Sequence, residues 1–222
     1  MRGARRQIPD VCVERLSLYV RELTRLGQRG VGYVSSRRLA EHVHVSDAQV
    51  RRDLSYFGQF GTSGRGYEVR RLQTALGQIL GIGGRTWYVG LAGVGNLGSA
   101  LLAYRGFRER GFEFRVAVDS NPDKVGKVVQ GLTVASSDRL VEIVRSQQLH
   151  IGIIAVPTDV AQHVCDRFVE GGVRAVVNFA PARLEVPATV RLRNVDLAIE
   201  LEALAFYLGR TRGLARQNGK AA

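Results

Sequence analysis

The stretch "YVGLAGVGNLGSALLAY", residues 88–104, has the pattern of a buried strand that runs through a glycine-rich turn into a helix. Gly93, Gly95 and Gly98 have the spacing GxGxxG. In such a turn the first glycine permits the sharp bend, the second leaves room for a pyrophosphate, and the third lets the helix pack closely. The stretch therefore predicts a dinucleotide-binding unit. Its expected phosphate cradle comprises Ala92, Gly93, Val94, Gly95, Asn96, Leu97 and Gly98.

A second apolar strand, "EFRVAVD", ends at Asp119, which follows Gly98 by 21 residues. A carboxylate about 20 residues beyond the glycines hydrogen-bonds the ribose of NAD, and it would repel the 2′-phosphate of NADP. The glycine spacing alone is weak evidence. Strand, glycines, helix and acid together favour NADH and NAD+ as cofactors.

Short apolar runs alternate with helical patterns through the rest of the second half. The predicted strands are "GLTV", "HIGIIAVP", "VRAVVNFAP" and "RLRNVDLAI". This alternation is typical of a doubly wound parallel sheet, whose ligands bind beyond the carboxyl ends of the strands. Two loops, Pro157-Thr158 and Asn178-Phe179-Ala180-Pro181, are therefore expected near the far end of the cofactor, with ordinary turns as the alternative.

The first eighty residues are basic and helical. They hold 14 arginines against 7 acidic residues, a surplus that is more than half of the chain's net charge of +12. This asymmetry favours nucleic-acid binding over a merely solvated, arginine-rich surface. Two short helical segments, "SSRRLAEHV" and "SDAQVRRDLSYFG", lie close together, and Ser46 with Gln49 forms a capping box at the start of the second.

On a helical wheel the second segment presents a face without a carboxylate at its centre. That face comprises Ala48, Arg52, Ser55 and Tyr56, with Gln49 and Arg51 on its flanks and Ser46 at its cap. Arginine pairs with guanine and glutamine with adenine, so the face predicts the recognition helix of a helix-turn-helix. Asp53 points toward the buried side, where we expect it to orient a neighbouring arginine.

A glycine-rich segment, "GQFGTSGRGYEV", follows at once and carries Arg65 at its tip. Such a hairpin directly after a recognition helix is typical of a wing that lays a basic residue along the DNA backbone or minor groove. The alternative for the whole segment is a small helical bundle with exposed arginines. Double-stranded DNA is the expected partner.

These patterns predict an α/β chain with a winged helix-turn-helix domain over residues 1–80 and a linker over residues 81–84. A Rossmann-like, doubly wound parallel-sheet domain follows over residues 85–198, and a C-terminal dimerisation helix and tail over residues 199–222. The last helix, "AIELEALAFYLG", has an apolar seam made of Leu197, Leu201, Leu204 and Leu208. With no element left to cover it, this seam favours a partner subunit and hence a homodimer, over packing on its own domain.

Several function classes lack the residues they need. No apolar run approaches the ~18 residues of a membrane span and no signal-peptide core is present, so we expect a cytoplasmic protein without membrane contact. The histidines and cysteines form no metal motif, and Cys12 and Cys165 are expected to be buried free thiols. No substrate domain follows the last strand, and His163, the one histidine near a strand end, fits an exposed or packed position. The chain is expected to sense its nucleotide without being an enzyme.

Nearly the whole chain resembles the redox-sensing transcriptional repressor (Rex) family of bacteria. The resemblance rests on "VRRDLSYFGQFGTSGRGY", "GVGNLGSALLAYRGF", "VDSNPDKVGK", "AVP", "NFAP" and "NVDLAIELEALAF". It implies a homodimer, with the terminal helix swapped into the partner, that binds an inverted repeat of operator DNA and releases it when NADH binds. It also implies that Tyr104 senses the nicotinamide and that Arg21 pairs with Asp196. Arg52 stands where the family commonly has lysine, so a different operator preference is expected.

Two other interpretations compete with this one. A metabolic enzyme of the CoA-ligase or dehydrogenase type would share the nucleotide-binding domain, but it would leave the acid-free helix face and the wing unexplained. A structural nucleoid-binding protein would leave the glycine spacing and Asp119 unexplained.

Overall fold

The computed structural model describes residues 8–218, with side chains through residue 208. The chain folds into two compact units that divide between Thr86 and Trp87. Residues 1–7 of the predicted first domain and 219–222 of the predicted terminal segment lie outside the described residues. Each unit has its own hydrophobic core.

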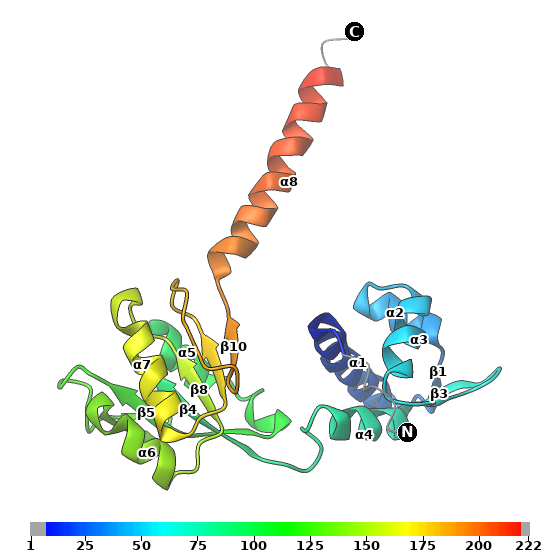
Figure 1. Cartoon of the computed structure of the whole chain (residues 1–222). Helices are drawn as coiled ribbons and strands as arrows, with labels where there is room; N and C mark the ends of the chain where they lie inside the picture. Colours follow the sequence, from blue (N-terminus) through cyan, green and yellow to red (C-terminus); the bar gives the residue numbers. More distant parts are fainter. Residues whose placement is uncertain (1–7, 219–222) are drawn as a thin grey trace. The chain divides into compact units, whose positions relative to one another are not determined.

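The first unit has the architecture of a winged helix (Figure 1). Its elements are α1 (Asp10–Gln28), β1 (Tyr33–Val34), α2 (Ser36–Val43), α3 (Asp47–Ser55), β2 (Gly61–Thr62), β3 (Gly66–Glu68) and α4 (Val69–Ile79). The three short strands form an antiparallel sheet in the order β1-β3-β2. The predicted hairpin after the recognition helix is therefore confirmed as β2 and β3.

Half of the predicted capping box forms at the start of α3. The Ser46 hydroxyl accepts a hydrogen bond from the Gln49 backbone N–H at 3.1 Å. The Gln49 side chain does not return to Ser46, because it donates to the Asp53 carboxylate at 2.7 Å. Helix α2 begins in the same way, with the Ser35 hydroxyl accepting from the Arg38 N–H. A serine cap thus positions each helix of the helix-turn-helix.

Helix α1 supplies much of the core of the first unit. Leu16, Tyr19, Leu23 and Leu26 lie on one face of α1, and each is at most 1% exposed. They pack against Val50 and Leu54 of α3 and against the buried leucines of α2 and α4. The buried side of α3 therefore belongs to the same core as α1.

The second unit is the predicted doubly wound α/β domain. Its elements are β4 (Trp87–Ala92), α5 (Asn96–Ala103), η1 (Arg108–Arg110), β5 (Phe112–Asp119), β6 (Val128–Val129), β7 (Leu132–Ser136), η2 (Ser137–Arg139), α6 (Leu140–Ser146), β8 (Ile151–Ile154), α7 (Thr158–Gly171), β9 (Ala175–Asn178), β10 (Arg191–Asn194) and α8 (Leu197–Asn218). The sheet order is β10-β9-β8-β4-β5-β7-β6, and every pairing is parallel except that of the edge strand β6.

The order of the strands marks where a ligand binds. From β4 the chain winds outward through β5 and β7, and it then returns to place β8, β9 and β10 on the other side of β4. The winding direction therefore changes between β4 and β8. In open α/β sheets the ligand lies at this change of direction, beyond the carboxyl ends of the strands.

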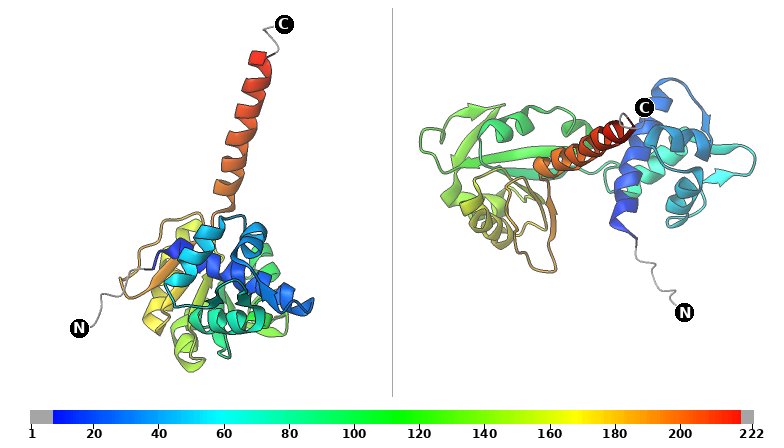
Figure 2. Two further views of the ribbon diagram at one scale, coloured as in Figure 1. Left: turned by 90° about the vertical axis from the view of Figure 1, so that its right-hand side faces the viewer. Right: turned by 90° about the horizontal axis from the view of Figure 1, so that it is seen from above.

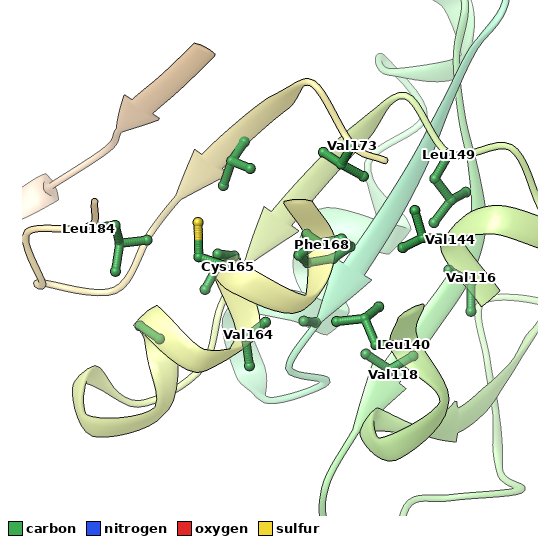
Figure 3. Close-up of a cluster of buried hydrophobic side chains, with 14 of the residues drawn as sticks. Val116, Val118, Leu140, Val144, Leu149, Val164, Cys165, Phe168, Val173 and Leu184 are labelled. Carbon is green, nitrogen blue, oxygen red and sulfur yellow. The ribbon is translucent and has the colours of Figure 1, made fainter. Parts of the chain in front are cut away.

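The larger core lies between the sheet and helices α6 and α7 (Figure 3). Phe168 of α7 is fully buried at its centre, close to Val116 and Leu149. A Cβ at Gly152 of β8 would lie only 2.8 Å from the Phe168 ring, so this strand can pass beneath the ring only with a glycine there. Leu101 and Leu102 of α5 cover the opposite face of the sheet, which is the two-sided coverage expected of a parallel sheet.

Helix α8 is a single continuous helix (Figures 1 and 2). Its seam residues, Leu197, Leu201, Leu204 and Leu208, are 59–68% exposed. The alternative that this seam packs on its own domain is therefore not observed for these side chains.

Both cysteines are buried and free, as predicted. Burial raises the pKa of each thiol, Cys12 and Cys165, to about 11. None of the helices within residues 8–218 combines the length and apolar character needed to cross a bilayer.

Candidate functional site

The glycine turn after β4 has the geometry that the sequence predicts. Gly93 adopts a φ of +95°, and a Cβ there would clash with the Ala155 carbonyl oxygen. A Cβ on Gly98 would collide with the Gly93 carbonyl oxygen, so α5 can lie this close to the turn only without a side chain. A Cβ on Gly95 would instead meet open space, which a phosphate can fill.

A cavity of about 620 Å³ opens beside this turn. Its lining comprises Ala92, Gly93, Gly95, Asn96, Leu97, Val118, Asp119, Ser120, Lys124, Ser137, Asp138, Leu140, Ala155, Val156, Pro157, Val160, His163, Val164 and Arg167. The first residues of α5 and the residue before α7 lie at its wall, so two helix N-termini meet there. Because helix N-termini carry free N–H groups and partial positive charge, this wall suits a diphosphate.

Five of the seven predicted cradle residues line the cavity, and two do not. Val94 is 5% exposed, and its backbone N–H donates to the Asp119 carboxylate at 2.8 Å. Gly98 is buried against the turn itself. These two residues therefore shape the cradle from behind and do not face the ligand space.

Asp119 lines the cavity at the end of β5, as predicted, but its oxygens are engaged. Oδ2 accepts from the Val94 N–H and from Lys124 Nζ at 3.0 Å, and Oδ1 accepts from the Asn121 N–H at 2.9 Å. Burial alone would raise the pKa of Asp119, but these backbone hydrogen bonds and the Lys124 ammonium hold it below its usual value. The carboxylate is therefore charged, and Lys124 offsets that charge locally.

The sequence interpretation missed a polar group of residues at this cavity. These residues are Lys124, Asp138 and Arg167; His163, which the sequence places near a strand end, is exposed and also lines the cavity. The Arg167 Nη2 donates to the Asp138 backbone carbonyl, whereas its buried Nε has no acceptor among the described residues. Only Lys124 had a usable signal, because a basic residue five positions after a ribose-binding acid returns toward it through the turn "DSNPDK".

The two loops predicted near the far end of the cofactor differ from each other. Pro157 lines the cavity and precedes the first turn of α7, whereas Thr158 is exposed outside the lining. Asn178 is fully buried, and its amide donates to the Ala180 and Ala182 carbonyls and to Asn194 Oδ1, each at 3.0 Å.

Asn178 therefore holds its loop to β10, which is the structural role that the ordinary-turn alternative describes. Phe179, Ala180 and Pro181 also lie outside the lining of the cavity.

The residues whose switch role rests on family resemblance lie at element ends or on a helix surface. Tyr104 follows α5, is 55% exposed and meets Phe107 edge-on with ring centroids 5.1 Å apart. It does not line the cavity. Asp196 precedes α8 and accepts from the Ala198 N–H at 2.9 Å, and Arg21 is exposed on α1. Arg21 and Asp196 belong to different units.

In the first unit, Asp53 has the predicted structural role. It is fully buried and accepts from Arg15 Nε at 2.6 Å and Arg15 Nη2 at 2.8 Å. The Tyr19 hydroxyl and the Gln49 amide also donate to it, at 2.8 and 2.7 Å. Burial would raise the pKa of Asp53, but the Arg15 guanidinium and the other donors hold it below its usual value. One carboxylate thus joins α1 to α3.

This network changes which predicted DNA-binding side chains are free. The Gln49 amide nitrogen donates one of its two N–H groups to Asp53, which holds the side chain in place and leaves one donor. Arg51 Nη1 donates to Asp47 at 2.7 Å and to Ser36 at 2.9 Å. Arg52 is exposed and has no hydrogen-bonding partner among the described side chains. Of the predicted face, Ala48, Arg51, Arg52 and Ser55 are exposed, whereas Gln49 and Tyr56 are half-buried.

The wing holds its arginine in a defined place. Residues 63–65 form the turn between β2 and β3, and the Arg65 N–H donates to the Thr62 carbonyl at 3.1 Å. The Arg65 guanidinium stacks over the Tyr33 ring, 4.1 Å from its centroid. A groove of about 590 Å³ lies between this hairpin and helices α2 and α3, with Ser36, Arg51 and Arg65 in its wall. Tyr33 was not identified from the sequence, because nothing in the chain order places β1 beside the wing tip.

Within residues 8–218, no three His, Cys, Asp or Glu side chains are grouped so that they could hold a metal ion.

Two family models match separate parts of the chain. The model of a CoA binding domain matches residues 85–182, and the model of a putative DNA-binding protein N-terminus matches residues 7–55. The division between the two matches falls between the helix-turn-helix and the parallel sheet.

Curated relatives match almost the full length. The redox-sensing transcriptional repressor Rex of Desulfitobacterium hafniense is 48% identical over 206 residues, which are 93% of this chain and 98% of that protein. The Rex protein of Streptomyces coelicolor is 45% identical over 208 residues, which are 94% of this chain and 80% of that protein.

Solved structures match as well. A structure of RSP in complex with beta-NAD+ and operator DNA has a TM-score of 0.89 at 34% identity, and the match covers 97% of this chain and 99% of that chain. A structure of RSP in complex with beta-NADH has a TM-score of 0.84 at 32% identity, with 94% and 98% covered.

Proposed function

Because the chain belongs to the redox-sensing transcriptional repressor Rex family, we propose that its glycine-turn cavity and its helix-turn-helix are the two coupled sites of one sensor. The protein is an NADH-sensing, DNA-binding transcriptional repressor, and its cofactors are NADH and NAD+. It is not an enzyme, so the metabolic-enzyme alternative is not favoured.

The observation that carries this function is the presence of both sites in one chain. The second unit has a diphosphate-sized cradle at the change of winding direction, and the first unit has a serine-capped helix beside a basic wing. A protein that only bound DNA would not need the first feature, and an enzyme would not need the second. The similar RSP structures hold beta-NAD+ with operator DNA in one case and beta-NADH in the other.

The described residues fit a dinucleotide. The open space at Gly95 leaves room for a diphosphate. Its hydrogen-bond donors would come from the two helix N-termini and from Arg167 Nε, which has no acceptor among the described residues. Asp119 and Lys124 lie where the ribose is expected. When it is bound, the cofactor supplies a nicotinamide ring that is neutral in NADH and positively charged in NAD+. The protein's task is to distinguish these two rings, and Tyr104 is the side chain that we assign to it.

DNA contact is assigned to the exposed face of α3 and to the wing. Arg52 is the base-reading residue in this assignment, Ala48, Ser55 and Tyr56 line its surroundings, and Arg65 contacts the backbone or minor groove. Gln49 and Arg51 flank this face; they are bonded within the unit and keep further N–H donors for DNA. As a repressor of genes, the protein would act in the cytoplasm, where bacterial DNA lies.

The two sites are coupled through a homodimer in this proposal. A dimer presents two recognition helices to an inverted repeat, so its symmetry has to match that of the operator. The exposed leucine seam of α8 is the surface that we assign to the partner subunit. A contact between Arg21 of α1 and Asp196 before α8 would then link the DNA-binding unit to the nucleotide-binding unit.

The test is operator affinity measured across NADH concentrations, for the unmodified chain and for Tyr104→Phe and Asp196→Ala. NADH is expected to weaken operator binding by about 5- to 150-fold, which is the usual range of coupling between two sites. Both variants should retain operator binding and lose part of the NADH response. If the two variants respond like the unmodified chain, the switch assignment is wrong. If saturating NADH leaves operator affinity unchanged in the unmodified chain, the sensor mechanism is wrong.

A further inference from the structure

The cavity of the second unit surrounds only part of a dinucleotide. Its lining contains the glycine turn, the N-terminal ends of α5 and α7, Asp119 and Lys124, which are the groups expected around a diphosphate and its adjoining ribose. Tyr104 and the residues 178–181, which are predicted on the nicotinamide side, do not line it. The preformed volume thus belongs to the adenosine diphosphate half of the cofactor.

The charges at this end suit a diphosphate without help from a nicotinamide. Two helix N-termini lie at the cradle, and Lys124 and Arg167 line the same cavity. The Lys124 ammonium is 3.0 Å from the Asp119 carboxylate and offsets its charge, and Asp138 is the second acid in the lining. The buried Arg167 Nε has no acceptor among the described residues, which leaves a donor for a ligand.

The remaining wall suits a flat base. Val118, Leu140, Val156, Val160 and Val164 give the lining an apolar part. Ser137 and Asp138 line the same cavity and add polar groups for the rim of a purine. Pockets of this kind, mostly apolar with a few placed polar groups, bind small molecules without large rearrangement.

We propose that adenosine diphosphates without a nicotinamide, of which ADP is the simplest, bind this cavity and act as antagonists of NADH. A ligand shifts a conformational equilibrium only by the difference between its affinities for the two states. ADP would fill the preformed half and leave Tyr104 untouched, so it would exclude NADH and leave the operator bound. The inference rests on the proposed function, and it makes the repressor respond to the ratio of NADH to adenosine diphosphates.

The test uses the full chain with an operator duplex and three ligands: NADH, ADP and adenosine. The fluorescence of bound NADH reports displacement, and a gel-shift or anisotropy titration reports operator binding. ADP is expected to displace NADH competitively and to move the NADH midpoint for operator release to higher concentration without changing the maximal release. Adenosine, which lacks the diphosphate, should displace NADH much more weakly.

Two variants locate the effect. Lys124→Gln, at the cavity, should lower the binding affinities of ADP and NADH by a similar factor, about 5- to 10-fold, since both ligands contain the adenosine diphosphate group that this cavity would hold. The matched control is Lys127→Gln, an exposed lysine three residues away that does not line the cavity, and it should change neither affinity.

The outcomes separate this inference from the proposed function. If NADH releases the operator but ADP binds more than about 1,000-fold more weakly than NADH, the cavity is not an adenosine diphosphate site by itself and the inference fails alone. If ADP without NADH releases the operator, the antagonist claim is wrong. If NADH does not release the operator at all, the proposed function fails, whatever ADP displaces.

Discussion

Arg52 is the residue on which base recognition depends in this account. It is exposed at the centre of the outer face of α3, whereas its neighbours Gln49 and Arg51 are held by Asp53 and Asp47. Arg52→Ala should cost ~1–3 kcal/mol on the best operator and relax the preference at one base pair. Selection of bound sequences from random DNA, before and after the change, measures both effects.

Arg65 provides the contrast at the same scale. It stacks on Tyr33 at the wing tip, and we assign it to the DNA backbone or minor groove; the prediction that follows is for a phosphate contact. Arg65→Ala should weaken binding to all sequences alike and reduce the slope of log affinity against log salt by about one. If neither Arg52→Ala nor Arg65→Ala alters binding, this surface does not read DNA.

Lys124 and Asp119 set the charge beside the ribose, and they act in opposite directions. The Lys124 ammonium lies 3.0 Å from the Asp119 carboxylate. A 2′-phosphate bound beside this pair would be repelled by Asp119 and attracted by Lys124. The ratio of NADH affinity to NADPH affinity in the unmodified protein should therefore be smaller than it would be if Asp119 had no lysine beside it. Lys124→Gln should widen the preference by about tenfold, and Asp119→Asn should narrow it. Calorimetry with both nucleotides measures the ratio; a change in the same direction for both variants would contradict the charge argument.

At the scale of elements, the junction of α1 with α3 depends on one buried carboxylate. Asp53 accepts from Arg15, Tyr19 and Gln49, and removing the charge leaves these donors without their acceptor. Asp53→Asn should lower the free energy of unfolding of the first unit by ~3–5 kcal/mol, as is usual for a broken buried pair. Asp47→Asn, at the exposed pair with Arg51, is the control and should cost less than ~1 kcal/mol.

The same carboxylate predicts how stability depends on pH. The pKa of Asp53 is lower in the folded chain than its unfolded value of about 3.9, so its contribution is complete above that pH. The contribution is lost as the pH falls below about 4 through the folded pKa, because the unfolded chain then binds the proton more readily. Acid unfolding monitored by circular dichroism should be less steep in Asp53→Asn. An unchanged acid transition would show that other carboxylates dominate it.

Helix α8 carries the prediction about assembly. Leu204 is 59% exposed within a seam whose four leucines are all exposed, so a partner subunit is expected to cover it. Leu204→Glu would place a carboxylate in that interface twice, once from each subunit of a two-fold dimer. The dimer dissociation constant should rise by at least ~100-fold, and Glu202→Gln, on the opposite side of the helix, should leave it unchanged. Analytical ultracentrifugation distinguishes these outcomes; an unmodified chain that is monomeric would contradict the assignment.

Elements with a strict local requirement could be predicted from the sequence. The turn at Gly93, the approach of α5 at Gly98 and the cap at Ser46 each need one residue type at one place, and each is found where it was expected. The strands alternate with helices because each apolar run is short and bounded by turn residues, so the winding of the sheet could also be predicted.

Residues that act through distant partners could not be predicted. Arg167 reaches the cavity from the third turn of α7, and Tyr33 meets Arg65 only because β1 joins the sheet of the wing. Asn178 looked like a cofactor residue because it ends a strand, yet its amide is used to close its own loop. Gln49 is different, because its partner is local: residues four apart are neighbours on a helix, so the bond from Gln49 to Asp53 could have been predicted from the sequence.

At the scale of the whole molecule, the central claim is that the nucleotide site and the DNA-binding face are energetically coupled. Coupling is reciprocal, so operator DNA must weaken NADH binding by the same factor by which NADH weakens operator binding. A neutral nicotinamide and a positive one should differ in this factor, with NAD+ competing for the cavity while the operator stays bound. Fold and family alone do not guarantee either property.

The most direct measurement is the affinity of NADH for the full chain with and without a saturating operator duplex, at constant salt. The account predicts that the operator lowers the affinity of the protein for NADH by about 5- to 150-fold. This factor should equal, within error, the loss of operator affinity at saturating NADH. The operator should lower the affinity for NAD+ by a smaller factor. A duplex of unrelated sequence, which binds weakly under these conditions, should leave the NADH affinity unchanged. An NADH affinity that is the same with and without the operator would contradict the account.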